Sequence, residues 1–108
     1  MAEIVWTEPA LSDLDAIADY IALDKPEAAR RLVHRVFEHV EQLVVHPKSG
    51  SVPPELRGSR YRQIVEPPCR VFYRYDGERV WILHTWWYPV VWRGFRGYVG
   101  RKFMQIVP

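Results

Sequence analysis

The sequence contains a single cysteine, Cys69, and no apolar run long enough to cross a membrane. One thiol excludes a disulfide within the chain and a metal site built on cysteines. Cys69 follows two prolines and precedes a predicted strand, so we interpret it as a small packed side chain and not as a nucleophile. No basic segment followed by an apolar one begins the sequence, so we expect a cytoplasmic protein that does not contact a membrane.

Charge is distributed unevenly along the chain. Residues 1–47 carry nine acidic and four basic residues, whereas residues 48–108 carry four acidic and eleven basic ones. The formal net charge of +2 therefore hides a basic C-terminal half. A basic half favours an acidic partner, either nucleic acid or an acidic protein surface, although compensation between the two halves is the simpler alternative.

The elements can be predicted from hydrophobic spacing. Apolar residues recur at helical intervals from Leu11 to Ile21 and from Ala29 to Val44, with Pro26 opening the second helix and Pro47 ending it. Strands are predicted at 3–6, 61–66, 70–75 and 80–84, with a hairpin turn at residues 76–77. This order indicates an α+β fold (β-α-α-β-β-β), in which an antiparallel two-helix hairpin packs on a small, mainly antiparallel β-sheet.

Alternation along the predicted strand at 70–75 separates its side chains into two faces. One face carries Val71, Tyr73 and Tyr75, and the other carries Arg70, Phe72 and Arg74. We expect the arginine-bearing face to point away from the helices and to be cationic and accessible.

Several short motifs occur in a fixed order along residues 3–85. They are Trp6 with Ala10-x-x-Asp13-Leu14-x-x-Ile17-x-x-Tyr20-Ile21, Pro26-x-Ala28-Ala29, Leu43-x-x-x-Pro47, Glu55-Leu56-Arg57-Gly58, Arg70-Val71-Phe72-Tyr73-Arg74 and Val80-x-Ile82-Leu83-His84. In this order and spacing they resemble the RelE/ParE toxin superfamily of type II toxin–antitoxin modules. The first helix, the Pro-x-Ala-Ala start and the Arg-x-Phe-Tyr-Arg strand are most similar to the ParE-like branch.

The resemblance implies one of two activities. A ParE-like toxin, used in plasmid stabilization, inhibits DNA gyrase by binding and is neutralised by a ParD-like antitoxin. A RelE-like or YoeB-like toxin cleaves messenger RNA on the ribosome without a metal. An inactivated toxin homologue is a third interpretation. None of the three needs a cofactor, and no pair of histidines has the spacing of a metal site.

Metal-free RNA cleavage needs a base, an acid and cations that stabilise the charged phosphorane. The resemblance to the YoeB-like branch provides the candidates Glu55, Arg70, His84 and Tyr88. His84 lies upstream of the position that the branch uses, and Lys48 is the only lysine between Lys25 and Lys102. The sequence therefore favours a binding protein over an enzyme.

Five arginines cluster between residues 57 and 74, on the predicted loop after the second helix and on the first two strands that follow it. They are Arg57, Arg60, Arg62, Arg70 and Arg74. We interpret them as candidates for binding an acidic target. The alternative is that some of them form surface ion pairs with Glu55, Glu66 and Glu78.

The end of the chain departs from the resemblance. We expect one toxin domain over residues 1–88, followed by a basic, aromatic extension at residues 89–108 that is not an independent domain. This extension is either a binding segment, an additional strand packed on this molecule or on a second copy in a homodimer, or the product of a reading-frame change.

Overall fold

The computed structural model describes residues 1–88 and confirms the predicted α+β architecture. The extension expected at residues 89–108 lies outside the described residues. The elements in chain order are β1 (Glu3–Trp6), α1 (Glu8–Ala22), α2 (Pro26–Glu41), the 3₁₀ turns η1 (Gln42–Val44) and η2 (Pro54–Leu56), β2 (Tyr61–Glu66), β3 (Cys69–Tyr75) and β4 (Arg79–Trp87).

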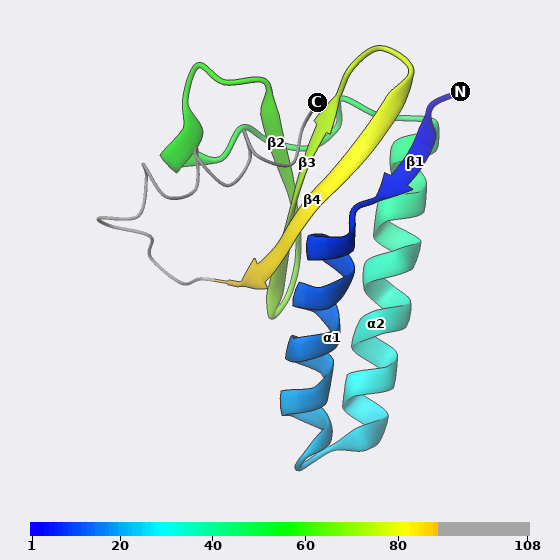
Figure 1. Cartoon of the computed structure of the whole chain (residues 1–108), viewed down its shortest axis with the longest axis vertical. Helices are drawn as coiled ribbons and strands as arrows, with labels where there is room; N and C mark the ends of the chain where they lie inside the picture. The colour runs from blue at the N-terminus through cyan, green and yellow to red at the C-terminus, as the bar shows by residue number, and fades with distance from the viewer. Residues whose placement is uncertain (89–108) are drawn as a thin grey trace.

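The sheet has the strand order β1-β4-β3-β2, so the last strand lies inside it (Figure 1). β4 pairs antiparallel with β3, and β3 pairs antiparallel with β2. β1 pairs parallel with β4, from Glu3 opposite Arg79 to Trp6 opposite Ile82. The sheet is therefore mainly antiparallel, as predicted, with one parallel strand at its edge.

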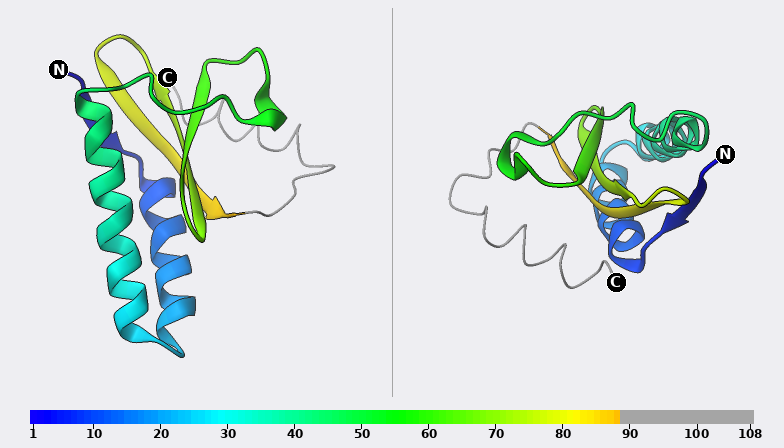
Figure 2. Two further views of the ribbon diagram at one scale, coloured as in Figure 1. Left: turned by 180° about the vertical axis from the view of Figure 1, so that it is seen from behind. Right: turned by 90° about the horizontal axis from the view of Figure 1, so that it is seen from above.

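The two helices run side by side on one face of the sheet and extend beyond it at their connected ends (Figures 1 and 2). Thr7 caps α1, because its hydroxyl accepts a hydrogen bond from the Ala10 amide (3.3 Å) and donates one to the Ile82 carbonyl (2.6 Å). Pro9 lies in the first turn, where a missing N–H has no cost. The cap therefore fixes the start of α1 against β4.

The main core lies between the helices and the sheet. It is formed by buried residues at helical spacing, including Leu14 and Ile17 of α1, Leu32 and Val36 of α2, and by alternate sheet residues. The buried sheet residues are Ile64, Cys69, Val71, Tyr73, Val80 and Ile82. Val71 and Tyr73 therefore face the helices, as alternation predicted.

Some predicted ends are wrong. The regular part of α2 ends at Glu41, and the hydrophobic pattern continues to Val44 only as a 3₁₀ turn. β4 extends to Trp87, three residues past the predicted end at His84, because its last residues still pair with β3. Within residues 1–88, no helix is both long enough and apolar enough to span a bilayer.

The loop between α2 and β2 is held against the sheet at Gly50. The amide of Gly50 donates a hydrogen bond to the Tyr73 hydroxyl (2.9 Å), and its carbonyl accepts one from Arg62 (2.8 Å). A side chain at this position would place its Cβ 2.6 Å from both the Gln63 carbonyl oxygen and the Tyr73 hydroxyl. Only glycine fits this close approach of loop to sheet.

We predict that Gly50→Ala lowers the free energy of unfolding by about 2 kcal/mol, because the new methyl group cannot be accommodated without moving backbone. Urea denaturation measures the change, and Ser49→Ala, at the exposed neighbouring position, is the control and should be close to wild type. Equal stability of the two variants would show that the loop is not held as described.

Candidate functional site

The far face of the sheet, on the side without helices, carries a second and smaller hydrophobic cluster. Phe72 and Leu83 are its buried centre. Leu56, Tyr61, Trp81 and Trp86 pack around them. Arg70 lies on this face, since its guanidinium carbon is 4.6 Å from the centre of the Phe72 ring. The face therefore brings together aromatic and basic side chains from the loop and three strands.

Arg70 is 4% exposed and forms a bidentate ion pair with Glu55. One guanidinium nitrogen lies 3.1 Å from Glu55 Oε1, and the other contacts Glu55 Oε2. The first nitrogen also donates to the side-chain oxygen of Gln63 (3.1 Å). The expectation that the guanidinium of Arg70 is accessible is therefore wrong, because a loop carboxylate has been brought over it.

The other four arginines divide into two groups. Arg62 donates to the Gly50 carbonyl and is thus used in holding the loop. Arg57 and Arg60 are exposed and Arg74 is half-buried, and within residues 1–88 none of these three forms an ion pair or hydrogen bond through its side chain. Accessible positive charge on this face is therefore carried by three arginines and not by five.

Arg74 lies between two aromatic residues. Tyr61 of β2 is opposite Arg74 of β3, and Arg74 is opposite Trp81 of β4. The Trp81 indole N–H donates to Asp76 Oδ2 (3.0 Å), which holds the ring against the β3–β4 turn. Hydrogen bonds from the Arg79 amide, the Trp81 indole and the Glu78 amide lower the pKa of Asp76 to about 2.

His84 is buried on β4 and contacts Asp13, a residue of the first motif to which the sequence assigned no role. Its Nδ1 lies 2.8 Å from Asp13 Oδ2 of α1, and the Thr85 amide donates to the same oxygen (3.2 Å). Because a carboxylate only accepts hydrogen bonds, Nδ1 of His84 is the donor to Asp13. No local pattern in the sequence shows that β4 lies across from Asp13.

The four nuclease candidates are only partly brought together. Glu55 and Arg70 are in contact. His84 lies on the neighbouring strand β4, opposite Phe72, and its ring centre is 5.1 Å from that of Trp86. Tyr88 is 43% exposed at the end of the described chain, where its amide donates to the Pro68 carbonyl (2.7 Å). The arrangement could supply a cation and an oriented imidazole, both of them buried.

Cys69 is fully buried in the main core, as expected for a packed side chain. Burial, followed by the nearby charge of Glu66, raises the pKa of its thiol to about 11. A thiol in this state is not a nucleophile at neutral pH.

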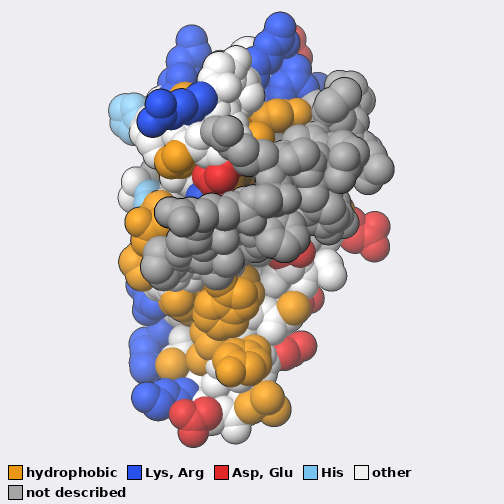
Figure 3. Space-filling view, turned by 90° about the vertical axis from the view of Figure 1, so that its left-hand side faces the viewer, with side chains coloured by type: hydrophobic (Ala, Val, Ile, Leu, Met, Phe, Trp, Pro, Cys, Tyr) orange, Lys and Arg blue, Asp and Glu red, His pale blue; other side chains and the backbone are white. Residues whose placement is uncertain are grey.

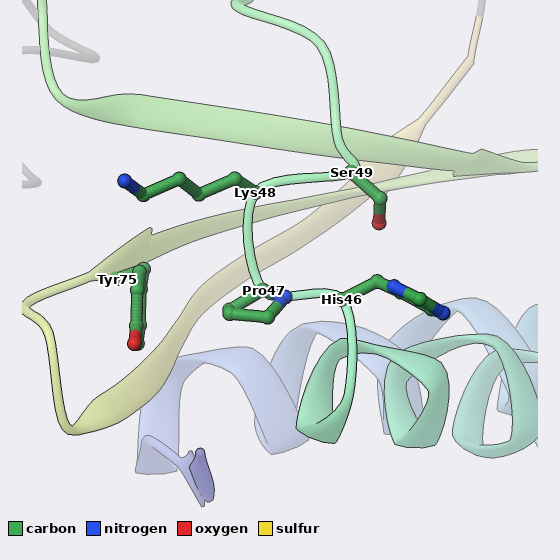
Figure 4. A pocket seen from close by; sticks show the side chains of 5 residues that line it. All are labelled: His46, Pro47, Lys48, Ser49 and Tyr75. Carbon is green, nitrogen blue, oxygen red and sulfur yellow. The ribbon is translucent and has the colours of Figure 1, made fainter. Parts of the chain in front are cut away.

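Neither the depression beside Pro47 nor a metal cluster provides another site in residues 1–88. The depression at the end of the helical layer is lined by His46, Pro47, Lys48, Ser49 and Tyr75 (Figure 4). The side chains of His46 and Lys48 point in opposite directions there, so they do not converge on a ligand. Residues 1–88 hold no group of three or more histidine, cysteine or acidic side chains that could bind a metal ion.

A hydrophobic surface lies where the helices extend past the sheet. Tyr20 and Leu23 are 69% and 86% exposed, and the Tyr20 ring meets the Trp87 ring edge-on at 5.8 Å. In the space-filling view, hydrophobic side chains gather over this lower part, with acidic side chains along one margin and basic ones along the other (Figure 3). Such a surface is typical of a protein-binding site.

Known proteins resemble this chain over most of its described length. A family model described as the ParE toxin of the type II toxin–antitoxin system parDE matches residues 4–86. Toxin RelE2 of Caulobacter vibrioides is 38% identical over 79 residues, which are 71% of this chain and 85% of that protein. A solved chain described as "Chromosomal ParDE TA system from P. aeruginosa" superposes with a TM-score of 0.63 at 30% identity, covering 79% of this chain and 94% of its own.

We predict that Glu55→Gln lowers the free energy of unfolding by about 3 kcal/mol, because it removes the carboxylate charge that pairs with the buried guanidinium of Arg70. The double variant Glu55→Leu/Arg70→Met should lose less than the sum of the two single changes, since it removes both charges. Chemical denaturation of the single and double variants measures this coupling.

The matched control is Glu27→Gln, which breaks an ion pair with Arg30 whose side chains are 68% and 78% exposed. That change should cost less than about 1 kcal/mol. If Glu55→Gln is no more harmful than the control, the buried pair does not hold the loop.

We also predict that native Cys69 resists thiol reagents at pH 8, because it is buried and because about one thiol in a thousand is ionised when the pKa is near 11. Reaction with a chromogenic disulfide should become stoichiometric only in denaturant. A Ser49→Cys variant, with one exposed thiol, should react at once, and rapid reaction of the native wild-type thiol would contradict the described burial.

Proposed function

Because the chain belongs to the ParE toxin family of the RelE/ParE superfamily, and is therefore a type II toxin–antitoxin toxin, we propose that it acts by binding and inhibiting DNA gyrase. In this proposal it is a binding protein and not an enzyme. A cognate ParD-like antitoxin neutralises it.

One observation carries the preference for binding over catalysis. The side chains that would act on RNA, Arg70 and His84, are 4% and 2% exposed, and each is joined to a carboxylate. A general base or a phosphate-stabilising cation has to reach the substrate directly. Of the five candidate arginines, Arg57, Arg60 and Arg74 are the ones that are accessible and form no ion pair or side-chain hydrogen bond within residues 1–88, and they occur with aromatic residues, which is a composition suited to a protein interface.

The antitoxin partner is supported by the ParDE assembly named for the solved relative. In this chain the exposed Tyr20 and Leu23, with the half-buried Trp87, form the surface that we expect an antitoxin to bury. Tyr20 and Leu23 lie at the connected end of the helices, which extends beyond the sheet (Figure 1).

A ribosome-dependent messenger RNA endoribonuclease is the second candidate. It is favoured by the contact between Glu55 and Arg70 and by the fixed imidazole of His84 in the neighbouring position of the same sheet. In such an enzyme Arg70 would stabilise the charged phosphorane and His84 would transfer a proton.

We predict that the purified full chain blocks supercoiling by purified gyrase and leaves messenger RNA intact in a reconstituted translation system. Adding the antitoxin should restore supercoiling, which controls for nonspecific inhibition. Messenger RNA cleavage in the ribosomal A site, if lost in Arg70→Ala, would replace the gyrase proposal with the nuclease. Activity in neither assay would indicate an inactivated homologue.

A further inference from the structure

Three side chains on the far face form a straight row across β2, β3 and β4. Tyr61 is paired with Arg74, and Arg74 is paired with Trp81, so the three are nearest neighbours on adjacent strands. Arg74 alternates with Tyr73 and Tyr75, which pack against the core under the helices. The row therefore projects from the face that α1 and α2 leave uncovered (Figure 2).

The two aromatic residues of the row are held in place before any partner arrives. Tyr61 and Trp81 pack against the buried Phe72–Leu83 centre, and the indole N–H of Trp81 is bonded to Asp76. Asp76 in turn accepts hydrogen bonds from the amides of Glu78 (2.9 Å) and Arg79 (2.8 Å). Because these side chains are already ordered, binding them costs little further conformational entropy.

The charge beside the row is positive. Arg74 lies within it, and Arg57 and Arg60 are exposed on the segment that leads from η2 into β2. Leu56 and Tyr61, which flank this segment, both pack on the Phe72–Leu83 centre, so the segment that carries the two loop arginines lies along the far face at the Tyr61 end of the row. Asp76, at the β3–β4 turn, accepts hydrogen bonds from the Glu78 and Arg79 amides and from the Trp81 indole, and within residues 1–88 it forms no ion pair with the three arginines.

We infer that Arg74, flanked by Tyr61 and Trp81 and supported by Arg57 and Arg60, is the centre of a docking surface for an acidic segment of a protein partner. Arginine, tyrosine and tryptophan are the residues that most often dominate the energy of protein interfaces. Three cations that form no ion pair in the described chain are complementary to carboxylates of a partner. This inference rests on the proposed function, in that the toxin acts by binding a protein target.

A nucleic acid fits the same surface less well. Stacking on bases needs an open aromatic ring face, whereas the rings of Tyr61 and Trp81 are half-buried against the Phe72–Leu83 centre.

The test measures the affinity of the full chain for purified gyrase holoenzyme. Arg74→Gln, and separately the pair Arg57→Gln/Arg60→Gln, should each weaken binding about tenfold or more, as loss of a central arginine does at protein interfaces. Arg31→Gln is the matched control, because Arg31 is exposed on α2 in the helical layer and loses the same charge. It should bind within about twofold of wild type, and the affinity should fall with added salt.

Unfolding curves of all variants check that the fold is retained, and Trp81→Phe, which keeps the ring packing but loses the bond to Asp76, gives an intermediate affinity. If wild type binds gyrase and Arg74→Gln binds equally well, the docking surface is wrong while the proposed function stands.

If wild type does not bind gyrase, the proposed function is wrong and the surface is tested with poly-L-glutamate and a single-stranded oligonucleotide as probes. Binding of poly-L-glutamate that Arg74→Gln weakens and Arg31→Gln does not would support the docking surface. Preferential binding of the oligonucleotide through Arg74, or binding of neither probe, would overturn it.

Discussion

The position of β4 inside the sheet is the constraint on which the rest of this structure depends. β4 has β3 on one side and the short parallel β1 on the other, and β1 covers only its first half. Where β1 ends, two side chains hydrogen-bond to the backbone of β4 in its place. The Thr7 hydroxyl donates to the Ile82 carbonyl, and the Asp13 carboxylate accepts from the Thr85 amide. The helical layer is thereby attached to one face of the sheet, and the other face is left for function.

This attachment explains why positive charge is arranged as it is. With the helices confined to one face, the arginines of β3 that alternate away from them share the far face with the loop before β2. The loop brings Glu55 over Arg70, which neutralises the most deeply placed guanidinium, and leaves Arg74 and the loop arginines toward solvent. The far face is thus divided into a neutralised, buried part and a cationic, accessible part.

The order and type of the elements could be predicted from the sequence, because helical and strand periodicities are local. Alternation along β3 also predicted correctly that Val71 faces the helices and Phe72 the opposite side. An ion pair between Glu55 and one of the arginines was predicted only as a surface alternative. That the partner is Arg70, that the pair is buried, and that His84 contacts Asp13 could not be predicted, since these contacts join residues 15 and 71 positions apart and depend on how a loop and a helix lie on the sheet. The irregular register between Phe72 and Tyr73, which sets the position of His84, leaves no mark in the hydrophobic pattern.

The burial of the Cys69 thiol has a practical consequence for studying this molecule. Since the sequence has no other cysteine and this one is enclosed by the core, a cysteine introduced anywhere on the outside can carry a fluorophore, a spin label or a crosslinker without first removing the native one. The protein is therefore ready for distance measurements and for mapping its contacts, with its own interior left unchanged.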